Sequence, residues 1–240
     1  MDFNEFDHTF CEAEIYGREY VNAVSSLFIT FIGANGLRKP TGYPAAGVYA
    51  AMIMNGVTSF FYHGWNTIGW GLMDRMSMVL IAISSISLFL RFLTGSRKMA
   101  ILWHIIAVFY ATCLLTAAGL HYETAFNILF GLFLVFLAGA VYLISKNAIR
   151  LKLPYRIVSY AERGILYIAA SGFFWIITEN LCFHVPWLKY LYGHVWWHIF
   201  VSYGGYLISL TPVYLSQRRD NAISYDEFGL PFLDPYLFRV

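Results

Sequence analysis

The sequence predicts an all-α membrane protein: one bundle of seven transmembrane helices, with the N-terminus outside and the C-terminus inside. Hydrophobic residues make up 59% of the 240 residues and charged residues only 12%, which is more apolar than a soluble domain needs to fill its core. Apolar runs of about 20 residues, the length that crosses the core of a bilayer, recur along the whole chain. The connections between these runs are short, which favours a single polytopic domain.

The apolar runs divide the chain into its expected elements. We expect helices at about 20–36, 44–63, 73–93, 100–120, 125–145, 159–182 and 194–215. This division leaves no room for a separate soluble domain. It predicts an acidic outer segment at 1–19, a seven-helix domain at 20–215 and an inner C-terminal tail at 216–240.

The charged residues predict the orientation of the bundle. Basic residues follow the first, third, fifth and seventh runs: Arg38, Lys39, Arg91, Arg97, Lys98, Lys146, Arg150, Lys152, Arg156, Arg218 and Arg219. Acidic residues precede the first run: Asp2, Glu5, Asp7, Glu12 and Glu14. Loops rich in Lys and Arg stay on the cytosolic side or its equivalent. Topology therefore explains the basic loops, and we expect no nucleic-acid partner.

Three histidines, a serine and an aspartate are expected at one depth near the outer membrane surface. His194 and His198 are one helical turn apart, so both project from one face of the last helix. This spacing suits two ligands of one metal ion, although histidine pairs near the interface are often ordinary hydrogen-bonding groups. The second helix ends with Ser59 and His63, again one turn apart, and the third begins with Asp74. Ionisable residues inside a membrane bundle usually mark a functional site.

This set predicts hydrolytic chemistry. Three imidazoles with a water in the fourth position make a catalytic zinc site. Asp74 could accept a proton from that water and return it to a leaving amine, and Ser59 could donate to the developing oxyanion. Alternatively, Asp74 pairs with Arg75, and the Ser59 hydroxyl bonds back to its own helix. A site at this depth meets lipids, so we expect an amide hydrolase that acts on a lipid.

Acidic residues before the first helix have two interpretations. Glu12, Glu14 and Glu19 supply carboxylates at short spacing, which suits calcium because calcium takes several oxygen ligands. A solvated acidic tail is the alternative. Cys11 and Cys182 are both expected on the outer side, where they could form a disulfide or remain two free thiols.

These motifs, taken in order, resemble the alkaline ceramidases, within the superfamily that also holds the adiponectin-receptor-like proteins. The resemblance rests on Ser59 and His63, on Asp74, on the stretch GHVWWHI at 193–199 and on FCEAE with EYVNAVSS before and within the first helix. It implies that His63, His194 and His198 bind zinc, that Asp74 works on the zinc water and that Ser59 assists. It also implies a calcium site with Glu12, Glu14 and Glu19, and a disulfide between Cys11 and Cys182.

The resemblance further implies hydrolysis of ceramide to sphingosine and a fatty acid. It favours the endoplasmic reticulum or the Golgi, while a mitochondrial inner or bacterial plasma membrane has compatible topology. Two departures favour an alternative. The stretch RMSM after Asp74 stands where an acidic, proline-containing one is expected, and Thr178 stands where Asp is expected. The alternative is a catalytically silent subunit of a larger membrane assembly, with the tail YDEFGLPFLDPYLFRV as its docking segment.

Overall fold

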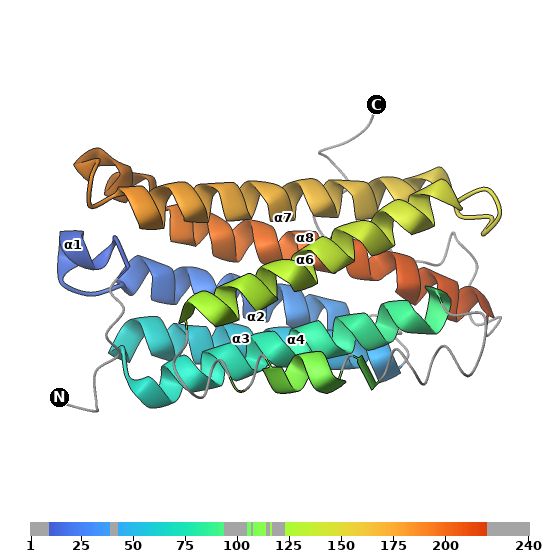
Figure 1. The fold of residues 1–240 in the computed structure, drawn as a ribbon, viewed down its shortest axis with the longest axis horizontal. Coiled ribbons are helices and arrows are strands. Elements are labelled where there is room, and N and C mark those ends of the chain that lie inside the picture. The colour runs from blue at the N-terminus through green and yellow to red at the C-terminus, as the bar shows by residue number, and fades with distance from the viewer. Residues whose placement is uncertain are drawn as a thin grey trace.

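A computed structural model describes residues 10–38, 43–93, 105–106, 108–113, 116 and 123–219 (Figure 1). The described residues are helical and contain no strand, which confirms the all-α prediction. The elements are α1 (Ala13–Tyr16), α2 (Tyr20–Leu37), α3 (Tyr43–Trp65), α4 (Ile68–Leu93), α6 (Glu123–Lys146), α7 (Tyr155–Leu181), the 3-10 helix η1 (Pro186–Leu191) and α8 (Gly193–Arg219).

Six long helices correspond to six of the seven expected runs. The largest shift is in α4, which begins at Ile68 rather than near residue 73. A short turn explains this shift, because Asn66 adopts a positive φ of 49° and ends α3 just before α4 starts. Of the expected helix at 100–120, only residues 105–106, 108–113 and 116 are described, and these are helical.

Four of the described helices are long and apolar enough to cross a membrane. The segments are Tyr20–Leu37, Ile68–Phe89, Ala125–Lys146 and Tyr155–Leu181. Large apolar side chains on the outside of the bundle, such as Val135, Leu166 and Phe173, are exposed at 68%, 69% and 61%. A lipid environment accommodates such a surface. The chain is therefore consistent with a membrane protein, while the count of seven helices and the orientation stay predictions.

Small residues allow the helices that carry the site to approach closely. A Cβ at Gly56 of α3 would lie 2.7 Å from the backbone carbonyl oxygen of Ser26 in α2. Similarly, a Cβ at Gly164 of α7 would lie 2.7 Å from the carbonyl oxygen of Gly204 in α8. Small residues at such crossings are typical of helix packing in membranes. The first crossing brings polar side chains of α2 against the end of α3.

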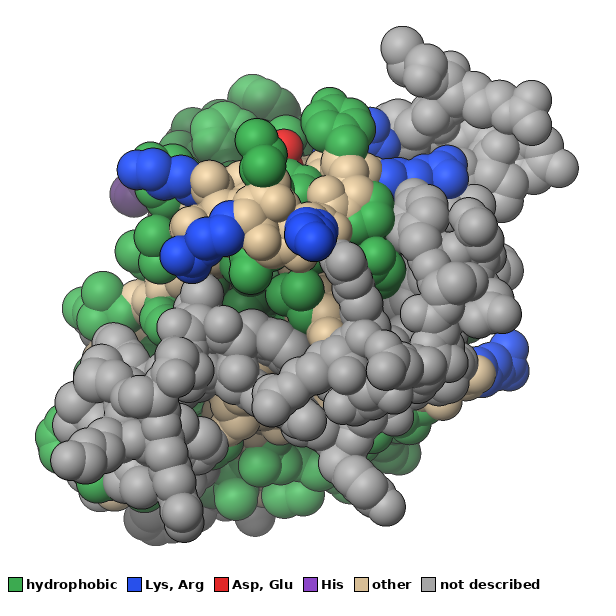
Figure 2. All heavy atoms as spheres, turned by 90° about the vertical axis from the view of Figure 1, so that its right-hand side faces the viewer, with side chains coloured by type: hydrophobic (Ala, Val, Ile, Leu, Met, Phe, Trp, Pro, Cys, Tyr) green, Lys and Arg blue, Asp and Glu red, His purple; other side chains and the backbone are tan. Residues whose placement is uncertain are grey.

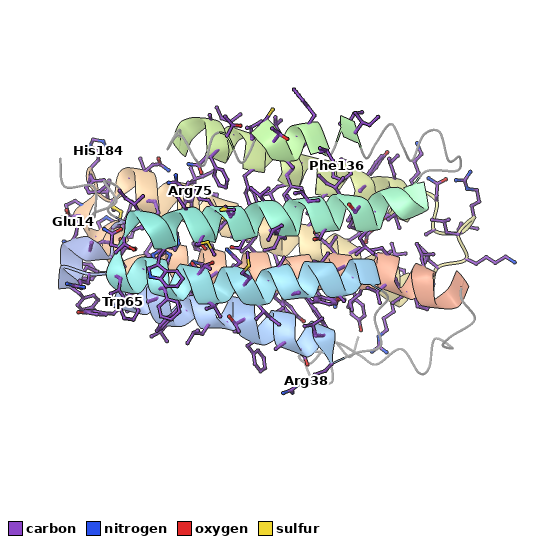
Figure 3. All side chains as sticks on the ribbon, turned by 90° about the horizontal axis from the view of Figure 1, so that it is seen from below. Glu14, Arg38, Trp65, Arg75, Phe136 and His184 are labelled. Atoms are coloured by element: carbon purple, nitrogen blue, oxygen red, sulfur yellow. A yellow bond between two sulfur atoms is a disulfide. The ribbon has the colours of Figure 1, made fainter. Side chains whose placement is uncertain are left out.

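The two ends of the bundle differ in chemistry. The start of α2, the end of α3, the end of α7 and the start of α8 share one end with α1 and η1 (Figure 1). The connection between α6 and α7 lies at the other end and carries Lys146, Arg150, Lys152 and Arg156. Figure 2 looks onto that end and shows Lys and Arg side chains gathered there. In Figure 3, Glu14, Trp65 and His184 lie near the end that holds α1, and Arg38 lies farther along, near the middle of the bundle's length.

Candidate metal centre

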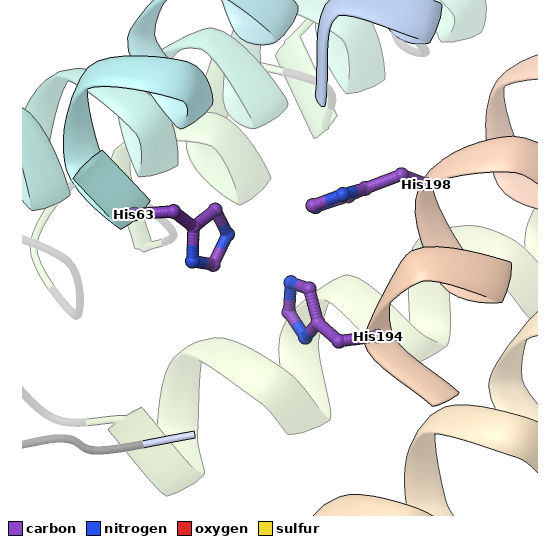
Figure 4. A group of neighbouring side chains, drawn as sticks. All are labelled: His63, His194 and His198. Atoms are coloured by element: carbon purple, nitrogen blue, oxygen red, sulfur yellow. The ribbon is translucent and has the colours of Figure 1, made fainter. Parts of the chain in front are cut away.

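Three histidines from two helices meet at the end of the bundle that holds α1. His63 lies in the last turn of α3, and His194 and His198 lie in the first turns of α8 (Figure 4). They expose only 3%, 6% and 2% of their surface. One potential ligand atom from each lies within 4.8 Å of the other two. The structure thus brings together the three residues predicted as metal ligands, in a group that could hold a metal ion.

A serine of α2 contacts one ring nitrogen of His198. The Ser25 hydroxyl donates to the backbone oxygen of Asn22 at 2.9 Å and lies 2.8 Å from Nδ1 of His198. This contact occupies Nδ1 of His198, whichever of the two atoms donates. Nε2 of His198 is then the nitrogen left to face a metal ion.

A carboxylate orients His63 in the same way. Oε2 of Glu19 lies 2.5 Å from Nδ1 of His63, and Glu19 is only 5% exposed. A histidine ligand commonly donates its other ring N–H to a carboxylate, which fixes the ring and increases its basicity toward the metal. The donor set therefore fits a metal centre in which Nε2 of His63 and Nε2 of His198 face the ion.

The ring of Phe10 covers the histidines on the side of the N-terminal segment. Its centroid lies 4.3 Å from that of His194 and 5.1 Å from that of His63. The backbone N–H of Phe10 also donates to Oε1 of Glu19 at 3.2 Å. Phe10 therefore shields the cluster with its side chain, a contribution that the sequence did not indicate.

Ser59 and Asp74 connect to the histidines through Ser26 of α2. The Ser26 hydroxyl lies 3.1 Å from Oγ of Ser59 and 3.5 Å from Nδ1 of His198. Ser59 in turn hydrogen-bonds the Asp74 carboxylate. Ser59 is 3% exposed. A chain of buried polar side chains thus runs from the carboxylate to the cluster.

The calcium prediction gains no support from the structure. Glu14 is exposed, whereas Glu12 and Glu19 are buried and bonded to protein groups. The two oxygens of Glu12 accept from the backbone N–H groups of Val21 and Asn22 at 2.6 and 2.8 Å. Burial raises the pKa of the Glu12 carboxyl, and these two backbone donors oppose the rise. Within the described residues the three histidines form the one group of potential ligands, and the solvated-tail alternative fits Glu14 alone.

A disulfide attaches the N-terminal segment to the end of α7. Cys11 and Cys182 are joined, with their Cα atoms 6.2 Å apart, as the resemblance implied. The backbone N–H of Cys11 also donates to Oε2 of Glu179 at 2.9 Å. These links keep the segment that carries Phe10 and Glu12 over the histidines.

The start of α8 is pressed against α7. A Cβ at Gly193 would overlap Oγ1 of Thr178, which is buried. A side chain at position 193 would therefore push α8 away or displace Thr178. Because His194 follows directly, this contact helps to define where the first ligand of α8 lies.

Sequence reasoning missed the supporting residues Ser25, Ser26 and Asn55. The first two lie in α2 one turn beyond Asn22, and a serine pair in an apolar helix was the available signal. Asn55 lies one turn before Ser59 in α3, so the two share a face. Nothing in the sequence shows which helix each face meets, which is why these residues carried no prediction.

Together the fold and the site define a helical protein with apolar, membrane-length helices and a buried three-histidine group suited to metal binding. The family model described as Ceramidase matches residues 4–231, and the chain therefore belongs to the ceramidase family. This membership confirms the resemblance seen in the sequence and makes the chain a member of a family of amide hydrolases that act on ceramide-like lipids. No curated protein matches the chain.

Proposed function

We propose that this protein is a zinc-dependent amidase that hydrolyses ceramide to sphingosine and a fatty acid. The observation that carries the proposal is the buried group of His63, His194 and His198, with Ser59 and Asp74 joined to it through α2. Family membership supports the substrate class. The location of the site at the end of membrane-length helices supports a substrate that lies in the bilayer.

The chemistry of the ligands favours zinc. Three neutral imidazoles are the protein ligands of several catalytic zinc sites, in which the fourth position is left open. When bound, Zn²⁺ would polarise the amide carbonyl and favour the ionisation of water at neutral pH. The Glu19 and Ser25 contacts with the Nδ1 atoms support this assignment, because they leave Nε2 of His63 and Nε2 of His198 for the ion.

Asp74 and Ser59 have complementary roles in the proposed reaction. Asp74 takes the proton of the attacking water, and the remaining hydroxyl bonds to the carbonyl carbon. Asp74 then gives the proton to the amide nitrogen as the C–N bond breaks, which releases the amine of sphingosine and the fatty acid. Once Asp74 is protonated, its carboxyl group is neutral and accepts more weakly from the Ser59 hydroxyl. The Ser59 hydroxyl can then donate to the developing oxyanion instead.

The test compares metal content and ceramide hydrolysis on the same purified samples of the unaltered chain, His198→Ala and His184→Ala. His184 is an exposed control between α7 and η1. We expect about one zinc per chain and release of fatty acid in the unaltered chain and the control, because a three-histidine site binds one ion. Both signals should fall to background in His198→Ala.

The two parts of the proposal fail in different ways. Folded protein without zinc, purified in the absence of chelators, would overturn the metal assignment. Bound zinc without hydrolysis of any ceramide, in a panel of different acyl-chain lengths, would overturn the assignment as an amidase. It would favour the alternative of a catalytically silent accessory subunit. The proposed docking tail of that subunit lies outside the described residues.

We also propose the endoplasmic reticulum or the Golgi as the membrane that houses the protein. This proposal rests on the ceramide-like substrate class of the family. Fluorescence microscopy of the tagged full chain beside markers of both compartments and of mitochondria tests it. Signal confined to mitochondria would overturn it.

A further inference from the structure

A second polar cluster lies between α3 and α4, beyond the residues assigned so far. Asn55 and Ser77 are buried, at 8% and 0% exposed. Nδ2 of Asn55 lies 2.8 Å from Oδ1 of Asp74, 2.9 Å from Oγ of Ser77 and 3.4 Å from the backbone oxygen of Asp74. The amide nitrogen of Asn55 thus lies against the carboxylate that we propose as the proton acceptor.

The surrounding groups define the orientation of this amide. The Ser77 hydroxyl donates to the backbone oxygen of Asp74 at 2.6 Å, so its oxygen is left to accept from Asn55. Both oxygens of Asp74 near Asn55, Oδ1 and the backbone carbonyl, are acceptors. A flipped amide would place the side-chain oxygen of Asn55 against the two Asp74 oxygens and the Ser77 oxygen. Nδ2 is therefore the atom that faces Asp74, and its two hydrogens are used by Oδ1 and Ser77.

Asn55 and Ser59 act on Asp74 from the same face of α3. They are four residues apart, so their side chains are neighbours along the helix. Asn55 donates to Oδ1, and Ser59 also hydrogen-bonds the carboxylate. Asp74 comes from the facing helix α4, so its orientation depends on these donors as well as on its own rotamer. Two donors from one helix hold the carboxylate in a single position.

We propose that Asn55 is a positioning residue for Asp74. Its amide donates to Oδ1 and holds the carboxylate in one orientation, which directs the other carboxylate oxygen to the reacting water. This inference rests on the proposed function, because it assigns a task within the same reaction. It also gives a reason for a buried amide at this depth of α3, where an apolar residue would pack with less loss of hydration.

The test uses Asn55→Leu, which keeps the approximate size and removes the donor. Asn147→Leu is the matched control, because Asn147 donates only to its own helix turn at the opposite end. We expect kcat to fall about 10- to 100-fold, as is typical for loss of a residue that orients a catalytic group. KM and zinc content should stay unchanged, because Asn55 contacts none of the three histidines.

A second readout does not need turnover. Infrared difference spectra between each chain and its Asp74→Asn derivative isolate the carboxylate bands of Asp74. We expect these bands to shift in Asn55→Leu and to remain in place in Asn147→Leu. Unchanged bands, or an unchanged kcat, in folded Asn55→Leu would overturn the inference. If the unaltered chain hydrolyses no ceramide, the proposed function fails, while the infrared spectra still decide whether Asn55 orients Asp74.

A milder variant covers the case in which Asn55→Leu does not fold. Ser77→Ala removes only the hydroxyl that aligns the Asn55 amide. We expect a smaller loss of kcat, about 3- to 10-fold, and a shift of the same carboxylate bands. Ser77→Ala with unaltered kcat and unaltered bands would overturn the inference.

Discussion

Glu19 joins the N-terminal segment to the histidine cluster. One oxygen accepts from the backbone N–H of Phe10 and the other lies 2.5 Å from Nδ1 of His63. The contact with Phe10 helps to fix the N-terminal segment, and the contact with His63 fixes the orientation of that ring. Glu19 therefore acts on the proposed metal through His63.

Substitution of Glu19 should weaken metal binding. Loss of a carboxylate behind a ligating histidine typically costs about 10- to 100-fold in metal affinity. We expect a loss of this size in Glu19→Ala. Glu19→Gln should lose less, because its amide oxygen can still accept from Nδ1 of His63. Competition with a zinc chelator of known affinity measures both, and Glu14→Ala is the exposed control. Equal zinc affinity in Glu19→Ala and the control would contradict the link to His63.

Single residues also show how far the sequence could be interpreted. The three histidines were predictable because helical spacing and membrane depth both follow from local sequence. The role of Asn55 was not, because it depends on the register between α3 and α4. Glu12 and Glu19 kept two interpretations, calcium ligands or a solvated tail, because an acidic run fits both. The sequence did not show that they accept from the backbone of α2 and lie against His63.

At the scale of elements, the start of α2 depends on a residue outside it. Glu19 occupies the N-cap position of α2 but makes no side-chain cap, because its carboxylate is engaged by Phe10 and His63. Glu12 instead accepts from the backbone N–H groups of Val21 and Asn22. Such acceptors satisfy the free donors of the first turn and complement the helix dipole.

Loss of this cap should destabilise the protein. We expect Glu12→Ala to lower the free energy of unfolding by about 0.5–2 kcal/mol, the usual cost of removing an N-cap acceptor. Thermal unfolding in detergent, followed by circular dichroism, measures the change in Tm. Glu14→Ala removes an exposed carboxylate two residues away and should leave Tm unchanged. A Tm for Glu12→Ala equal to that of the control would show that α2 does not need the cap.

The helices themselves were more predictable than their ends. Long apolar runs locate α2, α3, α4, α6, α7 and α8 because a bilayer core sets their length. Their boundaries depend on turns. Pro154 precedes α7 and Asn66 follows α3 with a positive φ, so α7 and α4 both begin earlier than the apolar run alone predicts. The contacts of Gly193 with Thr178 likewise depend on how α7 and α8 meet.

At the scale of the whole molecule, the disulfide connects the N-terminal segment to the end of α7. Cys11 and Cys182 are 171 residues apart, and their bond keeps the segment with Phe10 over the site. A chain-entropy model assigns about 5 kcal/mol to a loop of more than 100 residues. This value is an upper bound here, because a membrane already restricts the unfolded chain. The bond should therefore stabilise both the fold and the metal centre.

Removal of the disulfide should lower stability and zinc content together. In a Cys11→Ser/Cys182→Ser variant, the segment that carries Phe10 and Glu19 loses its covalent link to α7. The Glu19 carboxylate should then spend less time bonded to His63. We expect a lower Tm and weaker zinc retention against a chelator. Cys113→Ser, which removes the free cysteine, should match the unaltered chain in both measurements. A lower Tm of the double variant with zinc retention equal to that of the control would mean that the disulfide stabilises the bundle without supporting the metal centre. Unchanged values of both would mean that noncovalent contacts, such as that between Cys11 and Glu179, hold the segment in place without the bond.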